Sequence, residues 1–193
     1  TLAERMAFHK TPGVSIAVIN NGEIEWARSY GVVEAGAPER VTPRTIFQAA
    51  SISKPVAAFL AMRLVERGQV ALDQDVNARL TSWKVPENEL TAVEKVTLGR
   101  LLSHTAGTTM HGVPGSAPGA PMPSVLQILD GTPPADNPPV RVNAVPGSIF
   151  RYSGGGYTIM QQLLVDVTRS SFQALAADHM FTPIGMTDST FEQ

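Results

Sequence analysis

The stretch FQAASISKPVAAFLAMRLVERG, residues 47–68, contains the one Ser-x-x-Lys motif of this sequence, Ser51 to Lys54. Apolar residues recur through it at helical spacing, and a glycine follows as a stop signal. Pro55 falls in the first turn, where a helix does not need the missing N–H. The pattern predicts a helix over about residues 51–67, with Ser51 and Lys54 on one face and one turn apart.

This spacing suits a nucleophile and its base. A lysine that is short of water loses its proton more easily, so Lys54 could accept the proton of the Ser51 hydroxyl. Ser51 at the start of a helix also offers its backbone N–H to a developing negative charge. An N-cap serine beside a surface lysine fits the same residues equally well, so the motif needs support from the rest of the chain.

A second candidate element is Tyr152-Ser153-Gly154, which precedes a helix predicted over residues 157–168. A tyrosine held beside Lys54 could share in proton transfer, because a neighbouring ammonium lowers the pKa of a phenol. Read alone, Tyr152 fits an ordinary half-buried core tyrosine. The three glycines at 154–156 complete no phosphate-binding pattern, which argues against a nucleotide site.

A Ser-His-Asp triad is the main alternative arrangement for a serine nucleophile. The sequence has no Gly-x-Ser-x-Gly elbow, and His104 stands where a helix over residues 98–103 ends. A structural role for His104, bonding to loop backbone, is therefore favoured over catalysis.

Composition excludes several other classes of function. The 193 residues carry a net charge of −2 with scattered basic residues, which argues against nucleic-acid binding. No apolar run is long enough for a membrane helix. The absence of cysteine excludes thiol catalysis and cysteine-based zinc sites, and suits a periplasmic or secreted location better than a cytoplasmic one. Acyl transfer to serine needs neither a metal nor an organic cofactor, so none is expected.

The organisation of the chain is a hairpin followed by helices. Asn21-Gly22, between apolar runs at 14–19 and 23–33, predicts two strands joined by a tight turn. Helices are predicted at 1–9, 51–67, 98–103, 124–129, 157–168 and 172–180, around a proline- and glycine-rich excursion over 111–147. A lone hairpin leaves two open edges. Either this is a small two-stranded α+β protein, or the rest of the sheet is not in this chain.

Taken together, these segments resemble the class C β-lactamase-like family of serine hydrolases and penicillin-binding proteins. The resemblance runs in order through the opening hairpin, the nucleophile segment, a Gly-x-x-x-Leu-Asp stretch, a Leu-Leu-x-His-Thr-Ser-Gly segment, a Pro-Gly…Tyr-Ser-Asn region and a Pro-Leu-Gly-Met segment. In this chain they correspond to residues 12–31, 47–54, 68–75, 96–107, 146–157 and 181–191.

The resemblance implies an α+β fold of the β-lactamase/transpeptidase type, in which an antiparallel sheet with flanking helices meets a mostly helical lobe. Residues 1–68 would be the first part of the α/β lobe and residues 69–193 the helical lobe, with the remainder of the fold absent. The implied roles are Ser51 as nucleophile, Lys54 and Tyr152 as proton relay, and the Ser51 N–H as half of the oxyanion hole.

Two departures from the family pattern bear on function. The third motif, Lys-Thr-Gly or His-x-Gly on a later strand, has no match after Tyr152, so we expect a second polypeptide to complete the sheet. Gly154 stands at a substrate-binding position where asparagine is common, which removes a donor and acceptor for a substrate amide.

The resulting hypothesis is a serine hydrolase that forms an acyl-enzyme at Ser51 on a small-molecule or peptide substrate with a reactive carbonyl. The Gly154 departure favours esterase-like turnover, with β-lactamase-like turnover beside it. The alternatives are a penicillin-binding D-Ala-D-Ala carboxypeptidase, transpeptidase or D-aminopeptidase, and a non-catalytic binding protein on the same fold.

Overall fold

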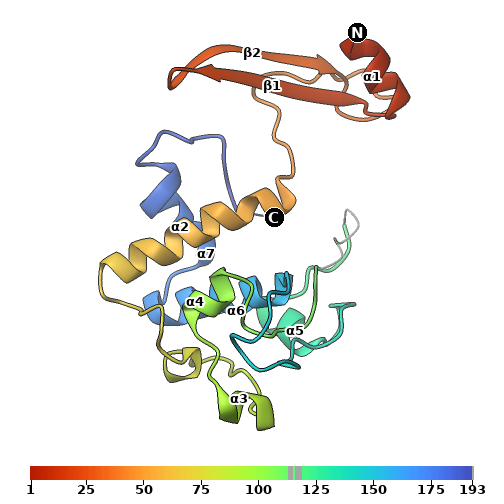
Figure 1. Cartoon of the computed structure of the whole chain (residues 1–193). Helices are drawn as coiled ribbons and strands as arrows, with labels where there is room; N and C mark the ends of the chain where they lie inside the picture. The colour runs from red at the N-terminus through yellow and green to blue at the C-terminus, as the bar shows by residue number, and fades with distance from the viewer. Residues whose placement is uncertain (113–114, 116–118, 193) are drawn as a thin grey trace. The chain divides into compact units, whose positions relative to one another are not determined.

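The computed structural model describes residues 1–112, 115 and 119–192. They form two compact units, Thr1–Ala49 and Ala50–Gln193, which we call the hairpin unit and the helical unit. In Figure 1 the residues of the hairpin unit are drawn in red to orange. The mixed α+β composition that the sequence predicts is confirmed, with the strands in the first unit and most helices in the second.

The hairpin unit contains helix α1 (Leu2–Phe8) and strands β1 (Gly13–Asn20) and β2 (Glu23–Gly31). The predicted hairpin is confirmed: the strands pair antiparallel from Gly13 opposite Gly31 to Asn20 opposite Glu23. Asn21 and Gly22 both have positive φ, at 50° and 81°, as a two-residue turn of the right twist requires. The register shifts by one residue between Val18 and Ile19, where Glu25 of β2 has no partner in the pairing.

One face of this hairpin is apolar. Val14, Ile16 and Val18 share it with Tyr30 and Trp26 of the opposite strand, where Arg28 between them lies over the Trp26 ring. The other face pairs small residues such as Ser15 with Ser29. All five apolar side chains are only half-buried. The hairpin is therefore amphipathic, and the described residues cover its more apolar face incompletely.

The helical unit is built around helix α6 (Gly154–Thr168), which packs against four of the other helices. Those helices are α2 (Ser53–Glu66), α4 (Leu98–Leu102), α5 (Val125–Asp130) and α7 (Phe172–Ala176). Helix α3 (Glu89–Val93) and the single turns η1 (Ala50–Ile52), η2 (Val76–Ala78) and η3 (Ala177–Phe181) complete it. Figure 1 shows α4 beside α6, with α2 above them in this view.

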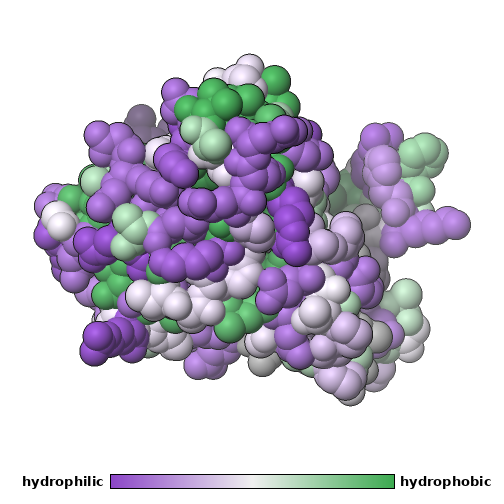
Figure 2. All heavy atoms as spheres, turned by 90° about the horizontal axis from the view of Figure 1, so that it is seen from below, coloured by the Kyte–Doolittle hydropathy of each residue, from purple (hydrophilic) through white to green (hydrophobic). Residues whose placement is uncertain are grey.

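One continuous apolar core holds the helical unit together. Its most buried side chains include Leu60 of α2, Leu101 of α4, Leu129 of α5, and Leu163 and Leu164 of α6, each at most 2% exposed. Outside the core, polar side chains cover most of the face drawn in Figure 2, and apolar ones gather in separate patches.

Several predicted helix bounds are corrected. The helix predicted from residue 157 begins at Gly154, because Ser153 caps it by accepting from the Gly156 N–H at 2.9 Å. The glycines serve close packing there: a Cβ at Gly155 would lie 2.9 Å from a Val140 methyl carbon. The helix predicted over 172–180 is two pieces, α7 and the π-helical turn η3.

Candidate active site

Ser51 and Lys54 lie at the start of α2, as the sequence predicts, but the helix itself begins later. Ser51 belongs to the 3₁₀ turn η1, and α2 starts at Ser53. Ala50, the residue before the serine, has a positive φ of 45°. The Lys54 Nζ donates to Ser51 Oγ at 3.0 Å, and the Ser51 side chain is exposed. The i, i+3 spacing thus brings the two groups into direct contact.

Tyr152 completes the cluster from the segment that leads into α6. Its Oη donates to Ser51 Oγ at 2.8 Å, although the two residues are 101 positions apart. Ser153 fixes this segment: it is 1% exposed, caps α6 and donates to the Thr109 carbonyl at 2.7 Å. The packing of α6 therefore carries Tyr152 to Ser51.

The electrostatics of the cluster make the Tyr152 phenol more acidic. Hydrogen bonding with Lys54 and then with Ser51 lowers the pKa of the Tyr152 phenol, and the charge of Lys54 lowers it further. The Lys54 ammonium also lies over the Tyr152 ring, 4.8 Å from its centroid. Ser51 Oγ therefore lies within hydrogen-bond distance of a phenol that loses its proton more easily than an ordinary tyrosine.

Tyr157, one turn into α6, lies beside this cluster and was missed by motif reasoning. Lys54 Nζ is 5.6 Å from its ring centroid, and its Oη donates to the Leu102 carbonyl at 3.2 Å. Burial raises the pKa of the Tyr157 phenol, and the neighbouring Tyr152 adds to the effect. The sequence does show two tyrosines close together, one just before a helix and one within it. No spacing rule assigns them separate roles, so this pattern did not identify Tyr157 as a neighbour of the site.

The expectation that His104 bonds loop backbone is confirmed. Its Nδ1 accepts from the Ser153 N–H at 3.1 Å, and its carbonyl accepts from the Arg151 N–H at 2.8 Å. The ring also stacks on Tyr152, with centroids 4.4 Å apart. His104 therefore contacts the cluster without touching Ser51 in any hydrogen bond of the described residues.

Gly154, the expected substrate-binding position, is the first residue of α6. Its N–H donates to the His111 carbonyl at 2.9 Å, and its carbonyl accepts from Thr158 Oγ1 at 3.1 Å. A Cβ at Gly154 would lie 3.0 Å from the His111 carbonyl oxygen and 3.3 Å from Gly112 Cα. The backbone of residues 111–112 therefore takes up part of the space that a side chain at 154 would need.

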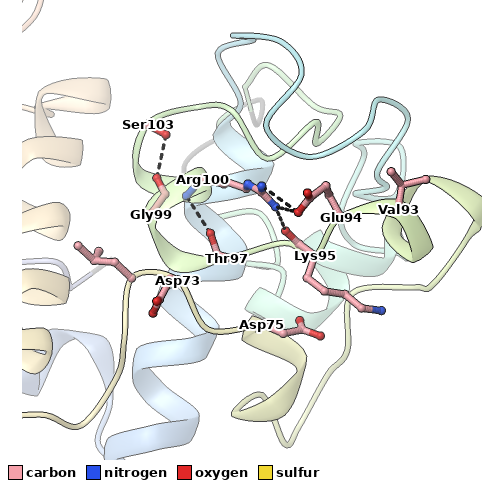
Figure 3. Close-up of a pocket in the computed structure, with 10 residues that line it drawn as sticks. Asp73, Asp75, Val93, Glu94, Lys95, Thr97, Gly99, Arg100 and Ser103 are labelled. Carbon is pink, nitrogen blue, oxygen red and sulfur yellow. Dashed lines mark hydrogen bonds and ion pairs between the residues drawn. The ribbon is translucent and has the colours of Figure 1, made fainter.

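A hollow of about 550 Å³ lies elsewhere in the helical unit and is drawn in Figure 3. Charged side chains line much of it, among them Asp73, Asp75 and Arg100. Arg100 is held there by Glu94, at 3.0 Å, and by the Lys95 carbonyl. None of Ser51, Lys54 and Tyr152 lines this hollow, so it adds nothing to the serine cluster.

The comparison with known families agrees with the geometry of the cluster. The family model described as "Beta-lactamase" matches residues 1–193, the whole chain. The chain belongs to the β-lactamase family. The resemblance inferred from the sequence motifs is thereby confirmed.

Individual relatives place the chain within this family. It is 31% identical over 181 residues to "Penicillin-binding protein 4" of Amycolatopsis lactamdurans, a match that covers 94% of this chain and 45% of that protein. Among solved structures, the octameric penicillin-binding protein homologue from Pyrococcus abyssi is 28% identical, with a TM-score of 0.74, and the match covers 96% of this chain and 42% of that one. The β-lactamase/D-alanine carboxypeptidase from Yersinia pestis, at 24% identity and a TM-score of 0.74, shares the fold over 98% of this chain and 53% of that one.

The chain thus spans about half the length of the relatives it matches. The β-lactamase/transpeptidase-like fold is confirmed, and the described elements correspond to part of it. Among the described residues, no helix has the length and apolar character needed to span a membrane.

Proposed function

We propose that this chain carries the nucleophile half of a serine hydrolase that forms an acyl-enzyme at Ser51. The observation that supports this most is the convergence of Lys54 Nζ and Tyr152 Oη on Ser51 Oγ, at 3.0 and 2.8 Å. A serine that only capped a helix would need neither group, and a binding protein would have no use for all three together.

In the proposed reaction, Ser51 Oγ bonds to the carbonyl carbon of the substrate. Its proton passes to the Tyr152 phenolate, while Lys54 stays an ammonium that stabilises the phenolate. Tyr152 then gives this proton to the leaving group as the bond from that group to the carbonyl carbon breaks. A water molecule attacks the acyl-enzyme by the same route, which releases the acid and restores Ser51.

The proposed substrates are esters, with β-lactams as a second class. The absence of an amide side chain at Gly154 removes a group that would hold a substrate amide, and the backbone of His111 and Gly112 lies against that position. An ester makes fewer demands on such a donor and acceptor pair. Turnover of a short nitrophenyl ester should therefore exceed turnover of a β-lactam, and the reverse order would contradict this assignment.

Peptidase action on a D-Ala-D-Ala terminus is the second candidate. It is supported by the names of two relatives, at 31% and 28% identity, which are described as a penicillin-binding protein and a homologue of one. Release of D-alanine from a peptide with that terminus would favour this candidate over the esterase.

We further propose that a second polypeptide segment completes the sheet. Two surfaces support this: the half-buried apolar face of the hairpin, and a second apolar side of α2. Phe59 and Met62 are each 44% exposed on the side of α2 opposite Ala57 and Ala61, which are buried, and Ile52, which precedes α2, is 77% exposed. A helix that is apolar on both sides is normally covered on both.

The test of the proposed function is covalent labelling with a fluorophosphonate, followed by intact-mass and peptide mapping. The wild type should gain one adduct on Ser51. Ser51→Ala should gain none, while Ser53→Ala, a serine two positions away on α2, should label like the wild type.

Three outcomes would be informative. An adduct on another residue, or equal labelling of Ser51→Ala, would contradict the assignment of the nucleophile. Ligand binding that survives Ser51→Ala in a protein that never labels would instead favour the non-catalytic binding protein.

A further inference from the structure

The His104 imidazole lies between the two tyrosines of the site. Its ring centroid is 4.4 Å from that of Tyr152 and 5.1 Å from that of Tyr157, with tilts of 30° and 34°. Phe150 meets the same imidazole edge-on at 6.1 Å. Both tyrosine rings that face Lys54 are thus stacked against one histidine.

A hydrogen bond fixes the state of this histidine. Nδ1 accepts from the Ser153 N–H at 3.1 Å, so it carries no proton of its own, and the neutral ring has its hydrogen on Nε2. Ser153 is the residue that caps α6 and directly follows Tyr152. The bond therefore joins the imidazole to the backbone that carries the proton acceptor.

The Lys54 ammonium contacts the rings of both tyrosines. It lies 4.8 Å from the Tyr152 centroid and 5.6 Å from the Tyr157 centroid, within the range of cation–π attraction. Tyr157 is held in turn by its bond to the Leu102 carbonyl. A shift of the imidazole would move the two surfaces against which the Lys54 ammonium is placed.

Protonation of His104 would disturb each of these contacts. A proton on Nδ1 would oppose the Ser153 N–H, and the new cation would lie near Lys54. Burial, then the charge of Lys54, then His111 lower the pKa of His104. The titratable groups that face it are Lys54 from α2, Tyr157 from α6, Tyr152 from the segment before α6, and His111.

We propose that His104 is a positioning residue whose neutral form is required for acylation of Ser51. It holds the Tyr152 backbone through Nδ1, and it supports the rings of Tyr152 and Tyr157 beneath Lys54. This role rests on the proposed serine hydrolase function. Protonation of His104 releases the Ser153 N–H and repels Lys54, so the site switches off in acid.

The test is the pH dependence of the acylation rate, measured on the full chain with a nitrophenyl ester from about pH 5 to about pH 9. Below the pKa of Tyr152, wild-type acylation should fall with the uptake of one proton. Below the ordinary His104 value of 6.5, it should steepen to the uptake of two.

Two variants separate the contributions of His104. His104→Asn keeps an acceptor for the Ser153 N–H, and His104→Phe keeps a ring between the tyrosines, but neither can be protonated. Both should retain the one-proton dependence into acid.

His104→Ala, which loses acceptor and ring, should acylate about 10²-fold more slowly at pH 8 with an unchanged KM, the cost of a misplaced catalytic group. His9→Asn, an exposed histidine of the hairpin unit, is the control.

The outcomes are distinct. A two-proton acid dependence that persists in His104→Asn and His104→Phe would overturn the role, as would wild-type rates in His104→Ala. If a variant does not fold, the wild type alone decides, because a one-proton dependence that continues down to the acid limit of the folded protein also overturns the role. A wild type that forms no acyl-enzyme at any pH overturns the proposed function, and this role with it.

Discussion

The hairpin unit and the helical unit differ in how much apolar surface they bury. Among the described residues, every member of the apolar core lies in the helical unit, and Val41 is the one buried apolar residue of Thr1–Ala49. Ile19 and Ile24, which face each other near the hairpin turn, are 70% and 69% exposed. The contrast separates a unit with its own core from one whose apolar sheet face stays half-buried.

The candidate site follows the same division. Ser51, Lys54 and Tyr152 all belong to the helical unit, and the buried Ser153 fixes the segment that carries Tyr152. The geometry of this cluster therefore depends on the core around α6. We propose that a further polypeptide completes the sheet. The hairpin unit would contribute to function through that completed sheet.

The largest expected effect comes from removing the cation of the site. Lys54→Met keeps the bulk of the side chain but removes the ammonium, whose hydrogen bond and charge lower the pKa of Tyr152. That pKa should rise towards its ordinary value, so the phenolate forms at higher pH and the acylation profile moves to the alkaline side. At pH 7 we expect acylation to fall about 10²- to 10⁴-fold.

The profile should be measured with the same nitrophenyl ester on wild type and variant. Lys84→Met, which removes a lysine outside the cluster, is the control for loss of a positive charge. An unchanged profile in Lys54→Met would contradict the assignment of Tyr152 as proton acceptor.

A pair of apolar-to-alanine substitutions, one in each unit, tests the contrast in burial. Leu163→Ala removes a side chain of α6 that is 2% exposed and should lower the free energy of unfolding of the helical unit by about 2–5 kcal/mol. Ile16→Ala, on the half-buried hairpin face, should change that free energy by about 0.5 kcal/mol or less.

Each unit contains one of the two tryptophans, Trp26 in the hairpin and Trp83 in the helical unit. Urea unfolding followed by fluorescence in a Trp26→Phe background therefore reports on the helical unit. Equal effects of Leu163→Ala and Ile16→Ala in that background would mean that the two units unfold as one body.

A smaller effect is expected at Asp166 of α6. Its carboxylate accepts from the Thr81 and Ser82 N–H groups at 2.6 and 3.0 Å, and from Ser82 Oγ at 2.7 Å. Burial raises the pKa of Asp166, but these bonds and one from Gln162 outweigh it, so the pKa is lowered. Asp166→Asn should cost the helical unit about 1–2 kcal/mol near neutral pH.

The sign of the pH dependence follows from the lowered pKa. The stabilisation is fully present above the unfolded-state pKa of about 3.9 and is lost as pH falls through the lower folded-state value. The difference between wild type and Asp166→Asn should therefore shrink in acid. Unfolding free energies near pH 7 and near pH 3 measure it, and a difference that grows in acid would contradict this account.

Local chemistry made part of the structure predictable. Asn21-Gly22 predicts the hairpin because both residues tolerate the positive φ that the turn requires, and the i, i+3 spacing predicts the contact between Ser51 and Lys54. Tyr152 could be joined to Ser51 only through family resemblance, because the packing of α6 carries it there across 101 positions.

Other features have no local signal. Helix α3 spans five residues, too short for a repeating apolar pattern, and was not predicted. The start of α6 was placed late because glycines usually weaken a helix, whereas here they allow the 108–111 segment and Val140 to approach closely. The stacking of His104 between Tyr152 and Tyr157 is likewise a product of tertiary packing.

Hydrogen exchange, measured by mass spectrometry with and without the polypeptide that we propose completes the sheet, tests the contrast between the units most directly. We predict that amides of α6 are protected in both samples, because its core is complete in this chain. Amides of β1 and β2 should exchange fast in the chain alone and become protected when the partner is present. Equal protection of the hairpin in both samples would contradict the account, since the hairpin would then need no further strands.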